Sequence, residues 1–498
     1  MPIQFFDTLS QRLVPFEPRE PGHARVYVCG PTVYDHAHLG HARACVVYDV
    51  LTRHLRERGL RVTYVRNVTD VDDKIIRRAA ELGEDPAVLA NRFSDAYAED
   101  SARLGCAEPN YTPRVSDHVP QIVALIEKLI GLGSAYAVDG DVFYSVSSFP
   151  EYGKLSHRKL EDLELGGSGR VTEDELQRKR HPADFALWKS AKPGEPTWKS
   201  PWGPGRPGWH IECSAMCIEH LGDTCDLHGG GLDLVFPHHE NEIAQSEAAT
   251  KQPFAKVWVH NGFIQFNKEK MSKSVGNFFT ARESFKFVEP EAVRYWLLSA
   301  HYRAPVNLEI DLDDAGKVRG FPQLDEAERR VEYLYSTRER LAALAPDRFD
   351  DTGTKVDAEL KKIPQQIAKA LDNDLGFPEA LAVLAEFLKR ANDAIDGASR
   401  KSGKLTRAAQ REIDAGFSAI GRVLGLGLGD GPAVLDRVRM RRLAATGLDK
   451  AHVEKLIAER IAARGAKNFA RADQIRDELA AVGVELMDSP RGTDWRMK

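Results

Sequence analysis

The chain has 498 residues, of which 42% are hydrophobic and 29% charged, and its net charge is −5 at pH 7. These values are ordinary for a globular protein of several domains and give no sign of a strongly basic nucleic-acid binder. No apolar run is long enough to cross a bilayer, and the N-terminus lacks a basic segment followed by an apolar core, so we expect a cytoplasmic protein without membrane contact. The six cysteines then indicate metal binding or simple burial in preference to disulfides.

The first part of the chain alternates between strand and helix patterns. Strands are expected at 25–29 and 61–67, with a helix over 40–58 between them and helical patterning over 73–102. This order predicts an α/β fold, with a parallel sheet of Rossmann type.

Later segments change character several times along the chain. The stretch near 161–208 is first charged and then rich in Gly, Pro and Trp, which indicates an insertion. After about residue 315, apolar residues recur at helical spacing, which predicts a bundle of helices. The expected units are 1–115 and 201–255 as two halves of the α/β domain, 116–200 as an insertion, 256–315 as a region with a lysine loop, 316–424 as a helical bundle, 425–432 as a flexible linker, and 433–498 as a small α+β domain.

Charge is spread unevenly between these units. From Gly431 to the end the chain has 14 Lys and Arg against 10 Asp and Glu, so this part is basic although the whole chain is acidic. A basic terminal module suits contact with a phosphate backbone, but it suits a solvated helical surface equally well.

Two short motifs suggest chemistry on a polyphosphate. His38 and His41 flank Gly40 just after the first strand, and Gly40 lets the backbone approach a phosphate at a helix N-terminus. Lys270 and Lys273 lie in a polar loop that can close over phosphates. Each motif alone is equally well explained as an exposed turn or a solvated loop, whereas the pair, with an α/β unit between its members, predicts an ATP site.

A glycine-rich segment follows at 228–233. Gly230 lies in a run of three glycines that suits close contact with a planar ligand, and Asp233 can accept hydrogen bonds from ribose hydroxyls. Taken alone, the segment is better explained as a tight turn with a capping aspartate.

Potential metal ligands are scattered along the chain. His238 and Glu242 are four residues apart, which places them on one helical face. Together with Cys29 and Cys213 they include only ligand types that zinc accepts. Spacing alone does not select this set, because there is no CxxC pair; the rival ligands are Cys217, Cys225, His228 and His239.

Several of these segments together resemble one family. The segments 27–35, 66–74, 208–216 and 228–246, with the two histidines and the two lysines, resemble class I aminoacyl-tRNA synthetases and, among them, cysteinyl-tRNA synthetases of bacterial type. The resemblance covers nearly the whole chain.

The resemblance implies a metal site and its purpose. In this family two cysteines, a histidine and a glutamate hold one zinc ion, and they match Cys29, Cys213, His238 and Glu242. A thiol has a pKa near 8.5, so zinc can hold its thiolate at neutral pH, whereas a serine hydroxyl ionises far less readily. The implied metal therefore selects cysteine over serine.

The resemblance also implies the remaining functional assignments. The activity is a cysteine–tRNA ligase that uses ATP with Mg²⁺, and the partners are L-cysteine and cysteine tRNA. The helical bundle and the tail would bind tRNA, and a monomer is expected. Trp495 is one candidate for reading the anticodon, although packing of the terminal domain explains this residue at least as well. The implied substrate-cysteine residues are Gly30, Thr32, Thr69, Trp209 and His228.

Two rival functions remain open. A related ligase joins activated cysteine to an amino sugar and lacks the terminal tRNA-binding module, so the basic segment after Gly431 argues against it. A catalytically silent tRNA-binding paralog would be expected to lack the four His and Lys residues of the two motifs.

Overall fold

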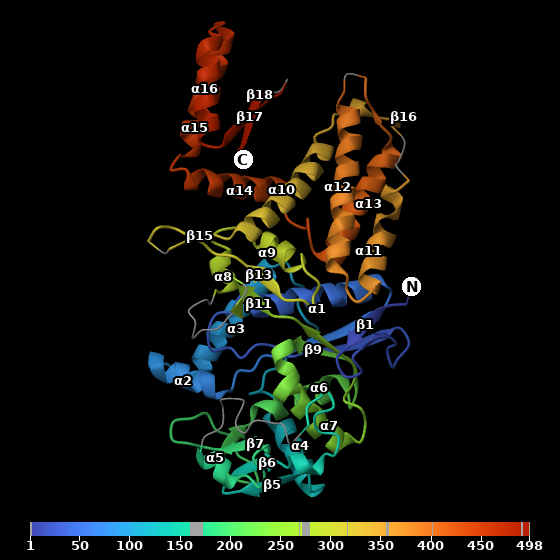
Figure 1. The fold of residues 1–498 in the computed structure, drawn as a ribbon, viewed down its shortest axis with the longest axis vertical. Helices are drawn as coiled ribbons and strands as arrows, with labels where there is room; N and C mark the ends of the chain where they lie inside the picture. Colours follow the sequence, from blue (N-terminus) through green and yellow to red (C-terminus); the bar gives the residue numbers. More distant parts are fainter. Residues whose placement is uncertain are drawn as a thin grey trace.

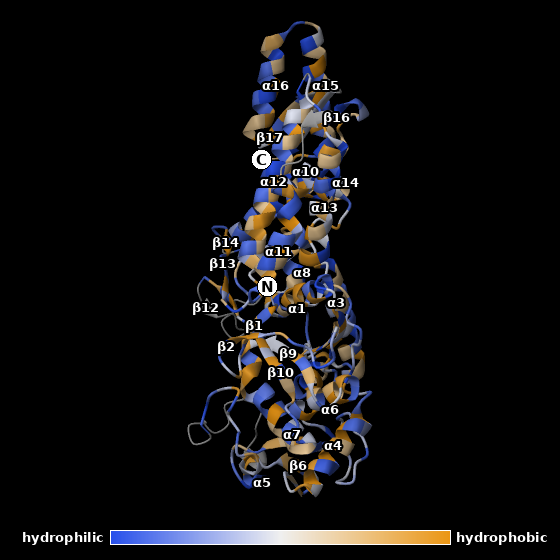
Figure 2. Cartoon of the chain, turned by 90° about the vertical axis from the view of Figure 1, so that its right-hand side faces the viewer, coloured by the Kyte–Doolittle hydropathy of each residue, from blue (hydrophilic) through white to orange (hydrophobic). Residues whose placement is uncertain are grey.

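The computed structural model describes residues 2–159, 173–267, 269–270, 279–315, 317–354, 358–400, 402–489 and 492–497. The molecule is elongated, with an α/β domain near the middle, a small sheet at one end, and helices at the other end (Figures 1 and 2). This arrangement confirms the predicted α/β fold class with following helical units.

A four-stranded parallel sheet forms the centre of the α/β domain. Its order is β10 (Ala255–Asn261), β9 (Cys225–Gly231), β3 (His23–Val28) and β4 (Arg61–Arg66). Helix α1 (Leu39–Glu57) connects β3 to β4 and covers the sheet. Most residues of β3 are buried, as expected for a parallel strand covered on both faces.

The strand order contains a reversal beside β3. The chain passes from β3 to β4 on one side, and β9 lies against β3 on the other side. The carboxyl ends of β3 and β9 thus form a topological switch point, where α/β sheets place ligands. Strand β10 continues this sheet to Asn261, past the domain boundary expected at 255.

The predicted helical stretch 73–102 is two helices, α2 (Asp73–Leu82) and α3 (Pro86–Arg103). Gly83 ends α2 with a φ of 67°, a left-handed conformation that glycine adopts without strain. Asp85 then caps α3 with Pro86 in its first turn, which is a typical helix start.

The insertion forms an antiparallel sheet at one end of the molecule (Figure 1). Its order is β5 (Ala135–Val138), β6 (Asp141–Tyr144), β7 (Phe185–Ser190) and β8 (Gly205–Pro207). Strand β8, which completes this sheet, lies beyond position 200, where the insertion is expected to end. Three helices complete this part of the chain: α4 (Val119–Gly131), α5 (Glu173–Arg178) and α6 (Trp209–Leu221).

Short elements surround the central sheet. Hairpin β1 (Gln4–Asp7) and β2 (Arg12–Pro15) packs against β10. Strand β11 (Ile264–Phe266) pairs with β12 (Glu269–Lys270) and β13 (Val306–Leu308). The other elements are α7 (Glu240–Thr250), α8 (Ala281–Ser284), α9 (Pro290–Leu297), β14 (Asp311–Leu312) and β15 (Val318–Gly320).

The bundle shares one hydrophobic core with the α/β domain, because buried side chains run continuously from α1 through α9 into the bundle. A second core under the insertion also includes apolar residues of α6 and α7. The elements of the bundle are α10 (Pro322–Ala342), β16 (Phe349–Thr354), α11 (Ile363–Asp372), α12 (Phe377–Ser399) and α13 (Arg407–Leu424).

The C-terminal unit has a small core of its own. Helix α14 (Gly431–Ala445) leads into it from the bundle and is joined to neighbouring helices by ion pairs such as Arg437–Glu289, at 2.7 Å. The unit itself comprises α15 (Lys450–Gly465), α16 (Phe469–Ala481), β17 (Val484–Ser489) and β18 (Gly492–Met497).

The segment 425–432, expected to be a flexible linker, packs against the bundle. Leu426 is fully buried, and the backbone N–H of Gly427 donates a hydrogen bond to Glu291. Among the helices within the described residues, none is both long and apolar enough to cross a membrane.

Candidate active site and metal cluster

A cavity of about 310 Å³ opens at the carboxyl ends of the central strands. Residues that follow each of the four strands contribute to its wall, as the switch-point topology predicts. The sequence-predicted residues among the cavity-lining ones are Cys29, Gly30, Thr32, His38, Gly40, His41, Thr69, Trp209, Cys213, Asp233 and His238. Eleven predicted residues, separated by up to 209 positions in sequence, therefore share one cavity.

The two histidines lie at the N-terminus of α1. His38 is the N-cap, and its Nδ1 accepts a hydrogen bond from the backbone N–H of His41 at 3.3 Å. The imidazole rings stack with their centroids 3.7 Å apart. A helix N-terminus carries partial positive charge, so the two rings and the N–H groups nearby form a site suited to a phosphate.

The segment after the lysine loop is bonded to this histidine turn. Phe279 accepts a hydrogen bond from Leu39, and Ala281 donates one to Ala37, at 3.2 and 2.9 Å. Of the lysines, Lys270 ends β12, and Lys273 lies outside the described residues. The backbone thus brings the C-terminal flank of the loop to the two histidines.

The segments after β3 and β4 run side by side along another wall. Thr32 and Thr69 pair as a parallel bridge, and the Gly30 N–H donates to Asn67 Oδ1 at 2.8 Å. The Thr69 hydroxyl in turn donates to the buried carboxyl of Glu212 at 3.3 Å. These contacts fix the wall that holds three of the predicted substrate-cysteine residues.

The four predicted metal ligands come together at the base of the cavity. Their ligand atoms all lie within 4.8 Å of one another, and all four side chains are buried. The Cys29 sulfur is 3.7 Å from the Cys213 sulfur and 3.4 Å from Glu242 Oε1. His238 Nε2 is 3.1 Å from the same Glu242 oxygen. Two sulfurs, an imidazole nitrogen and a carboxylate oxygen are a donor set that suits zinc.

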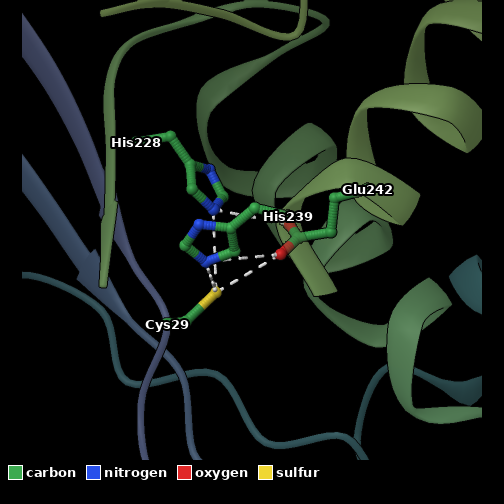
Figure 3. Close-up of side chains that lie close together, drawn as sticks. All are labelled: Cys29, His228, His239 and Glu242. Carbon is green, nitrogen blue, oxygen red and sulfur yellow. Dashed lines mark hydrogen bonds and ion pairs between the residues drawn. The ribbon is translucent and has the colours of Figure 1, made fainter. Parts of the chain in front are cut away.

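A second possible set overlaps the first. Cys29 and Glu242 also meet His228 and His239, as Figure 3 shows, with His239 Nε2 3.3 Å and His228 Nε2 3.6 Å from the Cys29 sulfur. These two histidines are fully buried and are not among the cavity-lining residues. By contrast, Cys213 and His238 line the cavity, so only the first set presents most of its donors to a substrate.

The ring of His238 is held on two sides. Its Nδ1 lies 3.1 Å from His210 Nδ1, and Trp209 stacks on the ring with the centroids 4.2 Å apart. Partners of this kind orient a metal-binding imidazole and are a usual feature of metal sites. Trp209 therefore lies against a candidate ligand while it also forms part of the cavity wall.

Burial makes the charged forms of these side chains costly. It raises the pKa of the Cys29 thiol well above its usual value, and the nearby Cys213 raises it further. Burial likewise raises the pKa of Glu242. A divalent cation reverses this effect, because it stabilises thiolate and carboxylate ligands. The chemistry of the donor set thus fits a resident metal ion.

Two predicted residues lie beside the cavity instead of in its wall. His228 stacks on Tyr27 behind the donor atoms, with centroids 5.1 Å apart. Gly230 donates a hydrogen bond to the Tyr48 hydroxyl, and its neighbour Gly231 takes the place in the lining. Two other predicted rivals, Cys217 and Cys225, form a third buried group with His228.

Sequence reasoning did not single out several lining residues, namely Tyr34, Cys45, Arg66, Lys74, Tyr97 and Asn261. Tyr34, Arg66 and Lys74 lie within the segments that carry the family resemblance, so the resemblance could have identified them as residues of the site. Cys45 follows His41 by four positions in a predicted helix, so helical spacing would have placed it on the same face.

Comparison with known proteins agrees with this geometry. Residues 15–316 match the family model of the class I (C) tRNA synthetase catalytic domain. Over its full length the chain is 52% identical to the cysteine–tRNA ligase of Anaeromyxobacter dehalogenans (strain 2CP-C) and 46% identical to that of Geobacter sulfurreducens, and the alignments also cover 100% of each relative. The chain belongs to the cysteine–tRNA ligase family. This membership confirms the resemblance predicted from the sequence.

Two further family models cover the helical parts. Residues 366–429 match the DALR domain, and residues 449–496 match the anticodon-binding domain of cysteinyl-tRNA ligases. Among solved structures, Mycobacterium tuberculosis methionyl-tRNA synthetase in complex with methionyl-adenylate is similar, with a TM-score of 0.58 and 17% identity over 86% of this chain and 96% of that one. This similarity concerns the fold.

Proposed function

We propose that the chain activates L-cysteine with ATP, releases pyrophosphate, and transfers cysteine to the 3′ end of cysteine tRNA. One observation carries the proposal: a buried Cys, Cys, His and Glu donor cluster opens into the same cavity as the paired histidines of α1. The cavity can thus hold a thiol and a polyphosphate side by side.

The ATP side of the cavity uses positive charge placed in advance. Negative charge builds on the α-phosphate oxygens as the cysteine carboxylate attacks, and donors already in position stabilise it. His38, His41 and the N-terminus of α1 are those donors in our proposal, and Gly40 allows close approach. Lys270 and Lys273 bind the β- and γ-phosphates with Mg²⁺, and Gly230 and Asp233 belong to the adenosine side.

The cysteine side is built around the donor cluster. Cys29, Cys213, His238 and Glu242 would hold one zinc ion, and the bound ion would ligate the substrate thiolate and so favour cysteine over serine. Trp209 keeps His238 in its orientation. Gly30, Thr32 and Thr69 position the amino-acid backbone from the wall formed by the segments after β3 and β4, and His228 supports Cys29 from behind.

The C-terminal unit fits a role in tRNA binding, since it matches the anticodon-binding domain of the family. Trp495 is 4% exposed and packs into the core of the unit, with the Arg439 guanidinium 4.9 Å above its ring. Packing is therefore its function, and Arg496, exposed on the same strand, is the better candidate for tRNA contact. A monomeric, cytoplasmic enzyme completes the proposal.

The same unit weighs against the amino-sugar ligase, which would not need a terminal tRNA-binding module. The intact His38 and His41 weigh against the silent paralog. The amino-sugar ligase and the proposed enzyme differ in the acceptor of the activated cysteine, so the acceptor is the quantity to measure.

The test is aminoacylation with labelled cysteine. Zinc-loaded protein is incubated with ATP, Mg²⁺ and bacterial tRNA, and label on acid-precipitated tRNA is counted. The control replaces tRNA with an amino sugar. We expect labelled tRNA and no labelled amino sugar; the reverse pattern identifies the rival ligase, and no product with either acceptor identifies the silent paralog.

A further inference from the structure

A chain of hydrogen bonds connects the N-terminal hairpin with the donor cluster. Thr8 lies in the turn between β1 and β2, and its hydroxyl oxygen is 2.7 Å from His260 Nδ1. His260 Nε2 is 2.7 Å from His239 Nδ1, and His239 Nε2 is 3.3 Å from the Cys29 sulfur. Figure 3 shows this last contact. Thr8 and His260 are 252 positions apart in sequence, and neither takes part in the proposed function.

Backbone contacts fix the hairpin end of this chain. The Thr8 N–H donates to the Trp258 carbonyl, and the Trp258 N–H donates to the Asp7 carboxylate, both at 2.9 Å, so the hairpin is held against β10. His260 follows Trp258 by two positions on the same strand, which places both side chains on one face of the sheet. These contacts hold the Thr8 hydroxyl against His260 without using the side chain of Thr8.

The whole chain lies in the interior of the protein. The exposed fraction is 8% for Thr8, 3% for His260 and zero for His239, and both ring nitrogens of each histidine have a partner in the chain. Burial lowers the pKa of His260 to about 3 and that of His239 well below its usual value, so each ring is neutral and carries one N–H. A buried polar atom without a partner is costly, so the links of the chain depend on one another.

The chemistry of Cys29 sets the direction of every hydrogen bond in the chain. As a metal ligand Cys29 is a thiolate, which can only accept, so the proton of His239 must be on Nε2. The Nδ1 of His239 then accepts from His260 Nε2, which leaves His260 Nδ1 as an acceptor. The Thr8 hydroxyl is therefore the donor to His260. One hydroxyl group thus determines which nitrogen carries the proton in both rings.

We propose that Thr8 and His260 are positioning residues of the metal site, which hold His239 in the tautomer that donates a hydrogen bond to the Cys29 thiolate. The inference rests on the proposed function, because it requires a metal at the donor cluster. His239 is then a partner of a ligand and not a ligand itself. Its hydrogen bond disperses the negative charge of a buried sulfur, which strengthens metal binding. Outer partners of this kind typically contribute about 10- to 100-fold to metal affinity.

Three variants separate the hydroxyl of Thr8 from its packing. Thr8→Val removes the hydroxyl and keeps a branched side chain of nearly the same shape, whereas Thr8→Ser keeps the hydroxyl. The matched control is Thr224→Val in the same domain. Thr224 is 5% exposed, and its hydroxyl donates to the Pro253 carbonyl at 2.6 Å, so this control loses a buried hydrogen bond outside the chain.

The first test measures zinc affinity of the full-length protein by competition with a chromophoric chelator, and so does not depend on activity. We expect T8V to bind zinc about 10-fold more weakly than the wild type, and T8S and T224V to bind it as the wild type does. Unchanged affinity in T8V, a loss that T8S does not reverse, or a loss that T224V shares would overturn the inference and leave the proposed function standing. A wild-type protein that binds no zinc would overturn both.

The second test observes the sulfur itself in protein loaded with Co²⁺ in place of zinc. The thiolate-to-cobalt absorption band reports the electron density on sulfur, so loss of the hydrogen bond should move the band to longer wavelength. We expect this shift in T8V and in His260→Asn, whose side chain is too short to reach His239. Because both residues act through one chain, the double variant should match H260N alone. Additive shifts would contradict the proposal, and an unshifted band in H260N overturns it even if T8V folds poorly.

Discussion

Gly30 lies where two backbone segments of the cavity wall touch. A Cβ atom at this position would lie 1.7 Å from the carbonyl oxygen of Asn67 and 2.8 Å from its carbonyl carbon. Real Cβ contacts essentially never fall below 3.0 Å, so Gly30→Ala requires the two segments to separate by at least 1.3 Å. The obstacle is backbone, which cannot rotate away as a flexible side chain can.

This separation would disturb both halves of the cysteine site. Gly30 directly follows Cys29, and the segment after Asn67 carries Thr69, which is bonded to the backbone of 31–33. Displacing catalytic groups by about 1 Å costs on the order of 100-fold in rate. Introducing an extra methyl group into a packed site costs about 1–3 kcal/mol of folding stability.

The assay is cysteine-dependent ATP–pyrophosphate exchange, with thermal unfolding measured on the same samples. We expect G30A to remain folded and to lose about two orders of magnitude in kcat/KM. The matched control is Gly397→Ala in α12, where a Cβ meets no atom within 4 Å, so exchange should be unchanged and stability should rise slightly. A G30A enzyme as active as the G397A control would refute the assignment of this wall to the substrate site.

Three further predictions follow from the site and from the interface between the α/β domain and the bundle. His238→Ala should lose bound zinc while His239→Ala retains it; the reverse pattern, measured by metal analysis of purified protein, would favour the overlapping donor set, which contains His239 in place of His238. Lys273→Ala should lower exchange by roughly 100- to 1,000-fold with zinc content unchanged, because a cation that stabilises phosphate charge is removed; undiminished exchange would contradict this role. Burial lowers the pKa of His54, which lies 3.0 Å from Asp372, to about 4. The folded protein therefore resists protonation at this site, whereas the unfolded chain accepts a proton near pH 6.5, so stability falls as pH decreases. Between pH 7 and pH 5 the free energy of unfolding of the wild type should fall by about 2 kcal/mol because of His54, and this fall should be absent in His54→Gln. Urea unfolding at the two pH values measures the change in each protein. An equal fall in both proteins would contradict the prediction.

The secondary structure was predictable wherever local pattern and packing agree. The helix expected over 40–58 is α1, and the helical bundle expected over 316–424 contains α10, α11, α12 and α13. The helical pattern over 73–102 predicts helix in this stretch without locating the break within it. Gly83 and Pro86 mark that break, and they determine where α2 ends and α3 begins.

The segment 425–432 shows what composition cannot reveal. Its glycines suggest flexibility, but a Cβ at Gly425 would meet the Arg294 guanidinium at 2.5 Å. Glycine at this position makes room for a side chain 131 positions away in sequence, which in turn bonds to the Leu424 carbonyl at 2.7 Å. Nothing in the local sequence identifies such a partner.

The donor cluster illustrates the same limit at the functional site. His238 and Glu242 were predictable as neighbours from their helical spacing, whereas Cys29 and Cys213 reach them only through the pairing of β3 with β9 and the packing of α6 on α7. The rival residues His228 and His239 also converge there, so residue type alone does not separate the two donor sets. Their positions relative to the cavity supply the physical criterion.

The central claim is that a metal held by Cys29, Cys213, His238 and Glu242 selects the substrate thiol. The most direct test is ATP–pyrophosphate exchange by the zinc-loaded protein with cysteine or serine as the only amino acid, repeated after the metal has been removed by chelation. We predict exchange with cysteine and none with serine, loss of exchange on chelation, and recovery on zinc addition. Exchange supported by serine, or cysteine-dependent exchange that survives complete metal removal, would contradict the claim.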